Sequence, residues 1–368
     1  MTTDQAATLD FTSALYLGLR HPSGALPPWS RFTTGVPAAL RESGTAAGVA
    51  RTLAALIGCE RATLGPSTLH MFWDLFQALP DSDSAIYMDA GLYPIARWGI
   101  ERAAARGVPV HAFPHHDADA LRRLLARGLT RGRPRIVTDG FCPRCGAPAP
   151  LAAYVEAARR LGGCLIVDDT QALGVLGDDP GPRAPYGYGG GGSLRRSGVT
   201  GPDVIVVASM AKAFGVPLAV LAGSETIVTR FEATSDTRMH CSPPSIPALH
   251  AASHALGVNR AYGDALRRRL ARLVLLFRRQ LARAGLSVTG DIFPVQTLAT
   301  VRGDAARGLH RALTSQRVLT VLRHDVEAAD ARLTLLLTAR HTSRDIAGLA
   351  HALSWVGWSA AAAVAGAE

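Results

Sequence analysis

The sequence predicts an α/β protein with a mostly parallel sheet in a large domain and a small α+β domain at its C-terminal end. Apolar runs of strand length alternate with segments of helical periodicity through the first part of the chain. A long helical stretch and a second, shorter set of strands and helices follow. We expect an N-terminal arm over 1–35, a large domain over 36–280, a small domain over 281–358 and a tail over 359–368.

The elements follow from periodicity and from turn residues. Gly58 is a typical helix end, and the turn Gly65-Pro66-Ser67-Thr68 is typical of a helix start that can hold a phosphate. The expected helices are 46–57, the part of 62–79 that follows this turn, 94–106, 117–127, 151–161, 245–285, 304–316 and 343–355. The expected strands are 9–19 (a short strand or extended arm), 84–88, 108–113, 135–139, 164–168, 204–208, 213–222, 291–301, 318–322 and 332–337. The Gly-rich insert 180–201 is expected to be a mobile surface loop.

The composition describes a globular, core-forming chain. Of its 368 residues 48% are hydrophobic and 18% are charged, and neither a signal peptide nor a bilayer-length apolar stretch is visible. We therefore expect a soluble, cytoplasmic protein that does not enter a membrane. Five scattered cysteines do not predict a disulfide framework. Cys142 and Cys145 form one CxxC pair without a second pair, so we expect no metal site, and a redox role for the two thiols stays open.

The formal net charge of +10 raises the question of nucleic-acid binding. Many arginines fall on the solvated faces of expected helices, and no aromatic-interleaved basic patch accompanies them. We therefore expect a small-molecule partner and no nucleic acid.

Lys212 is the only lysine in the chain, and the other 38 of the 39 basic residues are arginines. A GC-rich coding bias explains the missing lysines but not the one that remains. Arginine can replace lysine as a surface cation, whereas only an amine can condense with a carbonyl. The sequence therefore suggests that Lys212 acts as a nucleophilic amine.

Asp168 ends an apolar strand, and Lys212 follows the next apolar strand. A lone Asp at a strand end more often caps a helix, but the pair meets the needs of pyridoxal 5'-phosphate. This cofactor requires an amine for its aldehyde and a carboxylate for its ring nitrogen. It also requires phosphate donors, which Ser67, Thr68 and Ser209 could supply.

Several motifs along the chain resemble those of one family. They read L-D-F-T-S-A-L-Y-L-G-L, V-D-D-T-Q-A-L-G, S-M-A-K-A-F-G, C-S-P-P-S-I-P-A and R-L-T-L-L-L-T-A-R-H-T. They are similar to landmarks of the α-oxoamine synthases, the family of 8-amino-7-oxononanoate synthase and glycine C-acetyltransferase, within fold type I of the pyridoxal-phosphate enzymes. The resemblance covers nearly the whole chain and implies an aspartate aminotransferase-like fold and a homodimer.

By this resemblance, Lys212 would carry the cofactor, Asp168 would pair with its ring nitrogen and Ser209 would bind its phosphate. Tyr93 stands where the family has a histidine stacked on the ring, and its aromatic side chain could also stack. Gln171 stands where the family has a histidine near the ring's phenolic oxygen, and Gln171 cannot titrate near neutral pH.

Other departures concern the substrate. Ala14 and Pro143 replace a family Asn and Ser, and Thr334 stands where the family has an arginine that binds the amino-acid carboxylate. Arg332 lies two residues earlier on the same expected strand face and is our candidate substitute. Arg323 and Arg340 are alternatives, and a substrate without a carboxylate at that place is another.

Three hypotheses follow. The first is condensation of an amino acid with an acyl thioester, carried by coenzyme A or by a carrier, to an α-aminoketone. The second is an aminotransferase on the same scaffold, with Lys212 moving the proton. The third is a catalytically lapsed partner subunit, against which the surviving lysine argues. Aldol cleavage, β-elimination and decarboxylation stay open as other chemistry.

Overall fold

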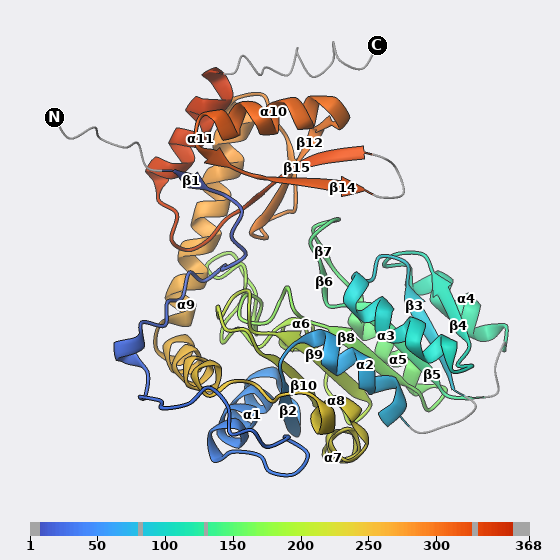
Figure 1. Ribbon diagram of the computed structural model, residues 1–368. Coiled ribbons are helices and arrows are strands. Elements are labelled where there is room, and N and C mark those ends of the chain that lie inside the picture. Colours follow the sequence, from blue (N-terminus) through green and yellow to red (C-terminus); the bar gives the residue numbers. More distant parts are fainter. Residues whose placement is uncertain (1–7, 80–83, 129–131, 326–329, 356–368) are drawn as a thin grey trace. The chain divides into compact units, whose positions relative to one another are not determined.

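The computed structural model describes residues 8–79, 84–128, 132–325 and 330–355 (Figure 1). The chain forms two compact units. The large unit consists of Leu19–Cys142 and Pro148–Asp264, and the small unit consists of Met1–Gly18, Pro143–Ala147 and Ala265–Glu368. The tail predicted at 359–368 and the first seven residues of the predicted arm lie outside the described residues. The predicted domain boundaries stay a prediction.

A seven-stranded sheet of order β2-β10-β9-β8-β5-β3-β4 forms the centre of the large unit. β10 is antiparallel to both of its neighbours, and the other neighbouring pairs are parallel. The mostly parallel sheet predicted from the sequence is therefore confirmed. The strands are β2 (Arg61–Gly65), β3 (Ala85–Asp89), β4 (Val110–Phe113), β5 (Pro134–Asp139), β8 (Cys164–Asp168), β9 (Val204–Ser209) and β10 (Ala219–Gly223).

The helix start predicted at the turn Gly65-Pro66-Ser67-Thr68 is confirmed, because α2 begins at Thr68 with Ser67 as its N-cap. Residues 61–65 form β2, a strand that was not predicted. β2 is short and is defined by its pairing with β10, which lies far away in sequence. The helices of the large unit are α1 (Gly44–Ile57), α2 (Thr68–Ala78), α3 (Pro94–Ala105), α4 (Ala118–Ala126), α5 (Leu151–Arg159), α6 (Ser193–Ser197), α7 (Glu225–Thr234) and α8 (Asp236–His240), with a 3-10 turn at Ser23–Ala25.

Helices α2, α3 and α7 cover one face of the large sheet (Figure 1). The core between them and the strands contains Ile86, Val137, Ile166, Ile205, Val207 and Leu221 from the sheet and Phe72, Leu75, Ile100 and Phe231 from the helices. Burial of side chains of this size stabilises a fold by about 1.5–3 kcal/mol each. Side chains along a strand alternate between the two faces of the sheet. This core therefore also identifies which residues at the strand ends face α2, α3 and α7.

The Gly-rich insert predicted as a mobile surface loop is instead packed into the large unit. Ser193 and Leu194 are buried, and the Asn259 side chain donates a hydrogen bond to the Gly189 carbonyl at 2.9 Å. A Cβ atom on Gly177 would lie 1.7 Å from the Tyr188 carbonyl oxygen, so the backbone passes there with no room for a side chain. Here glycine permits close packing of the backbone rather than an exposed loop.

The small unit contains an antiparallel four-stranded sheet of order β11-β12-β15-β14. Its strands are β11 (Val288–Thr289), β12 (Val295–Arg302), β14 (Val321–Asp325) and β15 (Asp330–Leu336), and its helices are α10 (Gly303–Ser315) and α11 (Ser343–Trp355). The predicted long helix is confirmed as α9 (Ile246–Arg283), which has 38 residues and contributes to both units. Two short strands, β6 (Phe141–Cys142) and β7 (Ala147–Pro148), follow β5.

The segment predicted as a strand or extended arm over 9–19 is a strand only at β1 (Leu9–Asp10), which pairs in parallel with β13 (Val318–Leu319). The chain then turns, because the Gly18 N–H donates to the Leu15 carbonyl and Gly18 adopts a φ of 64°.

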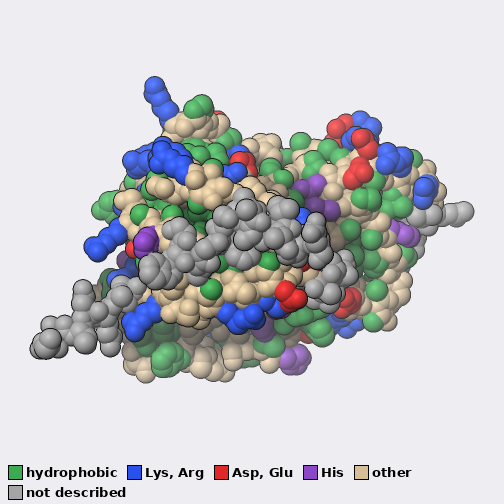
Figure 2. Space-filling view, turned by 90° about the horizontal axis from the view of Figure 1, so that it is seen from above, with side chains coloured by type: hydrophobic (Ala, Val, Ile, Leu, Met, Phe, Trp, Pro, Cys, Tyr) green, Lys and Arg blue, Asp and Glu red, His purple; other side chains and the backbone are tan. Residues whose placement is uncertain are grey.

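Basic side chains do not form one continuous band on the face shown in Figure 2. Among the described residues drawn there, they lie in separate groups, some with acidic side chains nearby. The helices of the described part of the chain include none with the length and apolar character needed to cross a membrane.

Candidate functional site

Three polar side chains meet at one edge of the large sheet. Asp139 and Asp168 are partners at the ends of β5 and β8, and Asp168 pairs with Val207, two residues before Ser209. Because partners in register project to the same face and side chains alternate along a strand, all three share the face covered by α2 and α3. Ligands collect at such carboxyl ends in parallel sheets.

Lys212 lies in the turn between β9 and β10, three residues beyond Ser209. Its Nζ lies 5.8 Å from the centre of the Tyr93 ring. Burial lowers the pKa of the Lys212 amine, and the negative charges of Asp168 and Asp139 oppose this effect. A buried amine with a lowered pKa is a better nucleophile than an exposed one, since more of it is unprotonated near neutral pH.

Asp168 is 5% exposed and carries one carboxylate into this buried edge. Burial raises the pKa of Asp168, whereas hydrogen bonds from Thr170 and the charge of Lys212 lower it. The Thr170 N–H donates to Asp168 Oδ1 at 3.1 Å. These partners favour the ionised form of Asp168, which is the form that can hold a protonated ring nitrogen.

Asp139 is a site residue that the sequence prediction missed. Its Oδ1 accepts a hydrogen bond from the Tyr93 N–H at 3.2 Å. Burial, and next the charge of Asp168, raise the pKa of Asp139 well above its ordinary value. The Tyr93 side chain is half-exposed at the start of α3, where Pro94 is the first helical residue. An Asp at the end of a predicted strand was visible here as it was for Asp168, but only the register showed that the two are neighbours.

The first turn of α2 lies at the same sheet edge. Gly65 pairs with Ala219, which in turn pairs with Ser209 across β10. Ser67 occupies the N-cap position without a side-chain capping bond, and its Oγ lies 2.8 Å from His70 Nδ1. Thr68 is the first helical residue. A helix start of this kind offers unpaired N–H groups and a positive dipole end to a phosphate.

The segment after Asp168 holds the other strand ends in place. The Thr170 hydroxyl accepts the Ser209 N–H at 3.2 Å, and Ser209 Oγ accepts the Ala211 N–H at 3.1 Å. Gln171 is half-buried next to Thr170. Its predicted role at the ring stays a prediction.

A histidine pair supports the lysine turn and was also missed from the sequence. His21 Nε2 lies 2.8 Å from the Phe214 carbonyl oxygen, and its Nδ1 lies 3.1 Å from His254 Nδ1. A carbonyl oxygen only accepts, so His21 carries a proton on Nε2. The only sequence indication was the H-P pair that ends the first family-like motif.

The predicted substrate residues lie in the small unit. Thr334 is 3% exposed, and its hydroxyl lies 2.9 Å from the Thr297 hydroxyl across β12 and β15. Arg332 is more accessible, with Nε 3.4 Å from Asp330 Oδ2. The Thr334 hydroxyl is therefore already hydrogen-bonded to Thr297 within the small sheet. Arg332 stays the candidate for binding a carboxylate.

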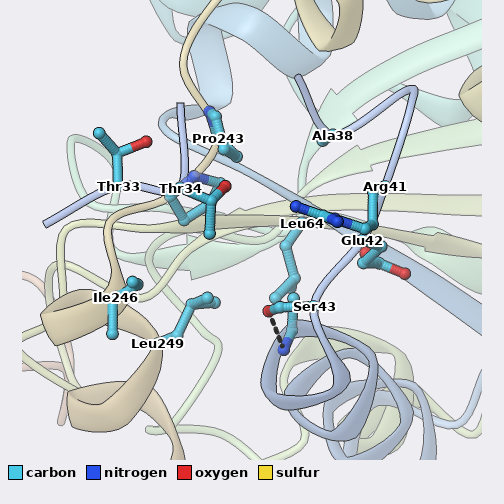
Figure 3. Close-up of a pocket in the computed structure, with 12 residues that line it drawn as sticks. Thr33, Thr34, Ala38, Arg41, Glu42, Ser43, Leu64, Pro243, Ile246 and Leu249 are labelled. Atoms are coloured by element: carbon cyan, nitrogen blue, oxygen red, sulfur yellow. Dashed lines mark hydrogen bonds between the residues drawn. The ribbon is translucent and has the colours of Figure 1, made fainter. Parts of the chain in front are cut away.

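A cavity of about 120 Å³ lies beside the start of α1 in the large unit (Figure 3). Leu64, Leu249, Thr34, Arg41 and Glu42 are among the residues that line it. Burial raises the pKa of Glu42, and the charge of Arg238 opposes this rise. Lys212, Asp168 and Tyr93 do not line this cavity, so it is distinct from the sheet-edge site.

The donor set at the sheet edge fits pyridoxal 5'-phosphate. An amine of lowered pKa, a buried carboxylate and a helix start lie around one strand edge, and an aromatic ring lies near the amine. Each matches one part of the cofactor: the aldehyde, the ring nitrogen, the phosphate and the ring face.

Comparison with known proteins agrees with this geometry. The family model for aminotransferase class I and II matches residues 47–353. The 8-amino-7-oxononanoate synthase of Klebsiella pneumoniae (strain 342) is 30% identical over 357 residues, which are 94% of this chain and 88% of that protein. The chain belongs to the α-oxoamine synthase family.

Other relatives extend this assignment. The 8-amino-7-oxononanoate synthase of Geobacter sulfurreducens is 31% identical over 93% of this chain and 87% of its own length. A serine palmitoyltransferase structure from S. paucimobilis has a TM-score of 0.82 at 17% identity, covering 95% of this chain and 88% of that one. An 8-amino-7-oxononanoate synthase structure from Francisella tularensis has a TM-score of 0.71 at 18% identity, covering 95% and 97%.

Membership of this family makes the chain a pyridoxal-phosphate-dependent enzyme with the fold type I architecture. The fold, the cofactor and the family predicted from the sequence are therefore confirmed. The roles of individual residues stay predictions.

Proposed function

We propose that this α-oxoamine synthase joins an amino acid to the acyl group of a thioester and releases an α-aminoketone. In this reaction a carbon–carbon bond forms at the amino-acid Cα and the carbon–sulfur bond of the thioester breaks. The thiol leaves, and Cα loses carbon dioxide or a proton. The observation that carries the proposal is the half-buried amine of Lys212, whose pKa is lowered by burial, near Asp168 at the sheet edge.

The bound cofactor supplies an electron-withdrawing ring that stabilises negative charge on the substrate carbon. We propose that the Lys212 amine would hold its aldehyde and would carry the proton to or from the amino-acid Cα. Asp168 keeps the ring nitrogen protonated through its negative charge. Tyr93, half-exposed at the start of α3, would stack on the ring.

Ser67, Thr68 and Ser209 are the proposed phosphate ligands, with N–H groups from the start of α2. We propose that Gln171 hydrogen-bonds near the ring and that Arg332 binds the amino-acid carboxylate. Arg332 is supported by its accessibility in β15, whereas Thr334 is already paired with Thr297. We also propose a homodimer, whose mass by light scattering would be about twice 38.7 kDa.

A product assay tests the proposed reaction. Purified protein with added cofactor is incubated with a panel of amino acids and acyl-coenzyme A thioesters, and both free thiol and product mass are followed. Thiol release should require the amino acid and should vanish in Lys212→Ala. Amino transfer to a keto acid without any thioester, together with no thiol release, would instead identify an aminotransferase.

A further inference from the structure

We propose that Asp139 is a positioning residue that keeps the single proton of the Asp139–Asp168 pair and anchors Tyr93 over Lys212. This inference concerns the proposed cofactor site and rests on the function proposed above. It explains why two carboxyls lie next to each other at a buried sheet edge that holds one amine.

The two carboxyls are neighbours because β5 and β8 pair with each other in the sheet. Asp139 and Asp168 are in-register partners on parallel strands and project to the same face. They are 7% and 5% exposed, so water screens their charges poorly. Two such carboxyls do not ionise together near neutral pH unless cations balance both.

The surrounding groups decide which carboxyl stays neutral. Asp139 lies next to Asp168 on β8, and its carboxyl also interacts electrostatically with Asp89 on β3, Cys142 on β6 and Lys212 in the turn after β9. Among the described charged groups that act on it, Lys212 is the one cation. Asp89 adds negative charge from the opposite face of the sheet, where its Oδ1 lies 2.7 Å from His115 Nδ1. More of the neighbouring groups therefore oppose the ionisation of Asp139 than favour it.

Asp168 has the better partners for a negative charge. It accepts the Thr170 N–H at 3.1 Å and a second hydrogen bond from the Thr170 side chain, and it interacts with the Lys212 charge. The donor to Asp139 is a backbone group, the Tyr93 N–H, at 3.2 Å. A neutral carboxyl still accepts this bond through its carbonyl oxygen. Asp139 can thus hold Tyr93 without placing a second charge beside the amine.

The Tyr93 contact links this pair to the cofactor position. Tyr93 precedes Pro94, so its backbone N–H is the last one before the helix start and fixes where the chain enters α3. The ring centre of Tyr93 lies 5.8 Å from Lys212 Nζ. Without the Asp139 acceptor, the Tyr93 backbone would be less restrained, and its ring would occupy a wider range of positions.

The single lysine makes a direct test possible, because amine-directed labelling reports on one side chain besides the α-amino group. Lys212 of the cofactor-free full chain is reductively methylated with ¹³C-formaldehyde, and the pH titration of its methyl resonance is recorded by NMR. The variants are Asp139→Asn and Asp168→Asn, with the buried Asp74→Asn as a control for neutralising a carboxyl on α2. Circular dichroism confirms that each variant is folded.

Asp168→Asn should lower the Lys212 titration midpoint by about one pH unit or more, because an ionised neighbour is lost. Asp139→Asn should move it by less than about a third of that, since it replaces a neutral group with a neutral group. Equal shifts in the two variants would overturn the proposal. Asp74→Asn should leave the midpoint unchanged.

The anchoring role has its own readout. Asp139→Ala removes the acceptor for the Tyr93 N–H and should reduce kcat roughly tenfold, about the effect of one lost hydrogen bond. Asp139→Asn retains an acceptor oxygen and should recover most of that loss. If Ala and Asn behave alike, Tyr93 anchoring is refuted.

The outcomes also separate this inference from the proposed function. If borohydride fails to fix the cofactor to Lys212, the proposed cofactor role of that residue fails whatever Asp139 does. If Lys212 binds the cofactor but the two Asn variants shift its titration equally, the inference about Asp139 fails alone.

Discussion

Replacing Asp169 with Asn should remove a pH dependence of stability that the wild-type chain carries. Asp169 is fully buried next to Asp168, and its Oδ2 accepts the Ser193 N–H at 2.9 Å. Burial raises the pKa of Asp169 from its ordinary 3.8 to about 7, although the bonds from Ser193 lower it. The folded protein therefore binds this proton more tightly than the unfolded chain does.

A carboxyl with a raised pKa contributes stability that is complete below its unfolded pKa and is lost as pH rises through the folded value. From pH 5 to pH 7 this loss amounts to about 2 kcal/mol for a shift of the size at Asp169. The amide of the Asp169→Asn variant offers the same acceptor to Ser193 but does not titrate. The free energy of unfolding of the variant should therefore fall less over this range, by about 2 kcal/mol.

Urea unfolding of the cofactor-free chain, followed by tryptophan fluorescence at several pH values, measures this difference. Asp304→Asn is the control, because the Asp304 side chain is 99% exposed. Its stability curve should run parallel to that of the wild type between pH 5 and pH 7. If the Asp169→Asn curve also runs parallel to the wild type, the reasoning about burial at this edge is refuted.

Three further outcomes are expected. Lys212→Arg should abolish visible cofactor absorbance and borohydride labelling, since a guanidinium does not condense with an aldehyde; persistent labelling would contradict the role of Lys212. Arg332→Ala should raise KM for the amino acid at least about tenfold with a smaller effect on kcat, whereas Arg344→Ala on α11 should not; equal effects would reject Arg332 as the carboxylate ligand. Gly177→Ala should lower the midpoint of thermal unfolding markedly, because its Cβ would lie 1.7 Å from the Tyr188 carbonyl oxygen, and an unchanged midpoint would be inconsistent with this packing.

The elements that could be predicted are those whose limits are set locally. β8 and α11 have the predicted bounds, and α1 ends before Gly58, which adopts a φ of 95° as a helix-ending glycine does. Apolar periodicity and caps lie within a few residues of each other in such segments, so distant contacts add little.

The elements that could not be predicted are defined by partners far away in sequence. β2 is a strand because it pairs with β10, and the Gly-rich insert is packed because Asn259 and Asp264 bind Gly189. Composition alone indicated flexibility for that insert. Its positive-φ glycines serve close contacts that composition does not show.

The residues of the site also fall into those that could be predicted from the sequence and those that could not. Lys212 and Asp168 were found from residue type and strand position, because the cofactor demands an amine and a carboxylate. Asp139 and the His21–His254 pair were missed, because their importance depends on strand register and on a contact between residues separated by more than two hundred positions. A single sequence does not show such contacts.

Asn259 is the only asparagine in the chain, and this has a consequence for chemical ageing. Spontaneous deamidation of asparagine has one possible target here, inside α9 and 7% exposed. Conversion to aspartate would replace the amide donor to the Gly189 carbonyl with a negatively charged acceptor and push the Gly-rich segment away from the helix. Stored samples should therefore stay chemically uniform at asparagine for as long as α9 remains folded, and any damage there should appear first as loosening of residues near Gly189.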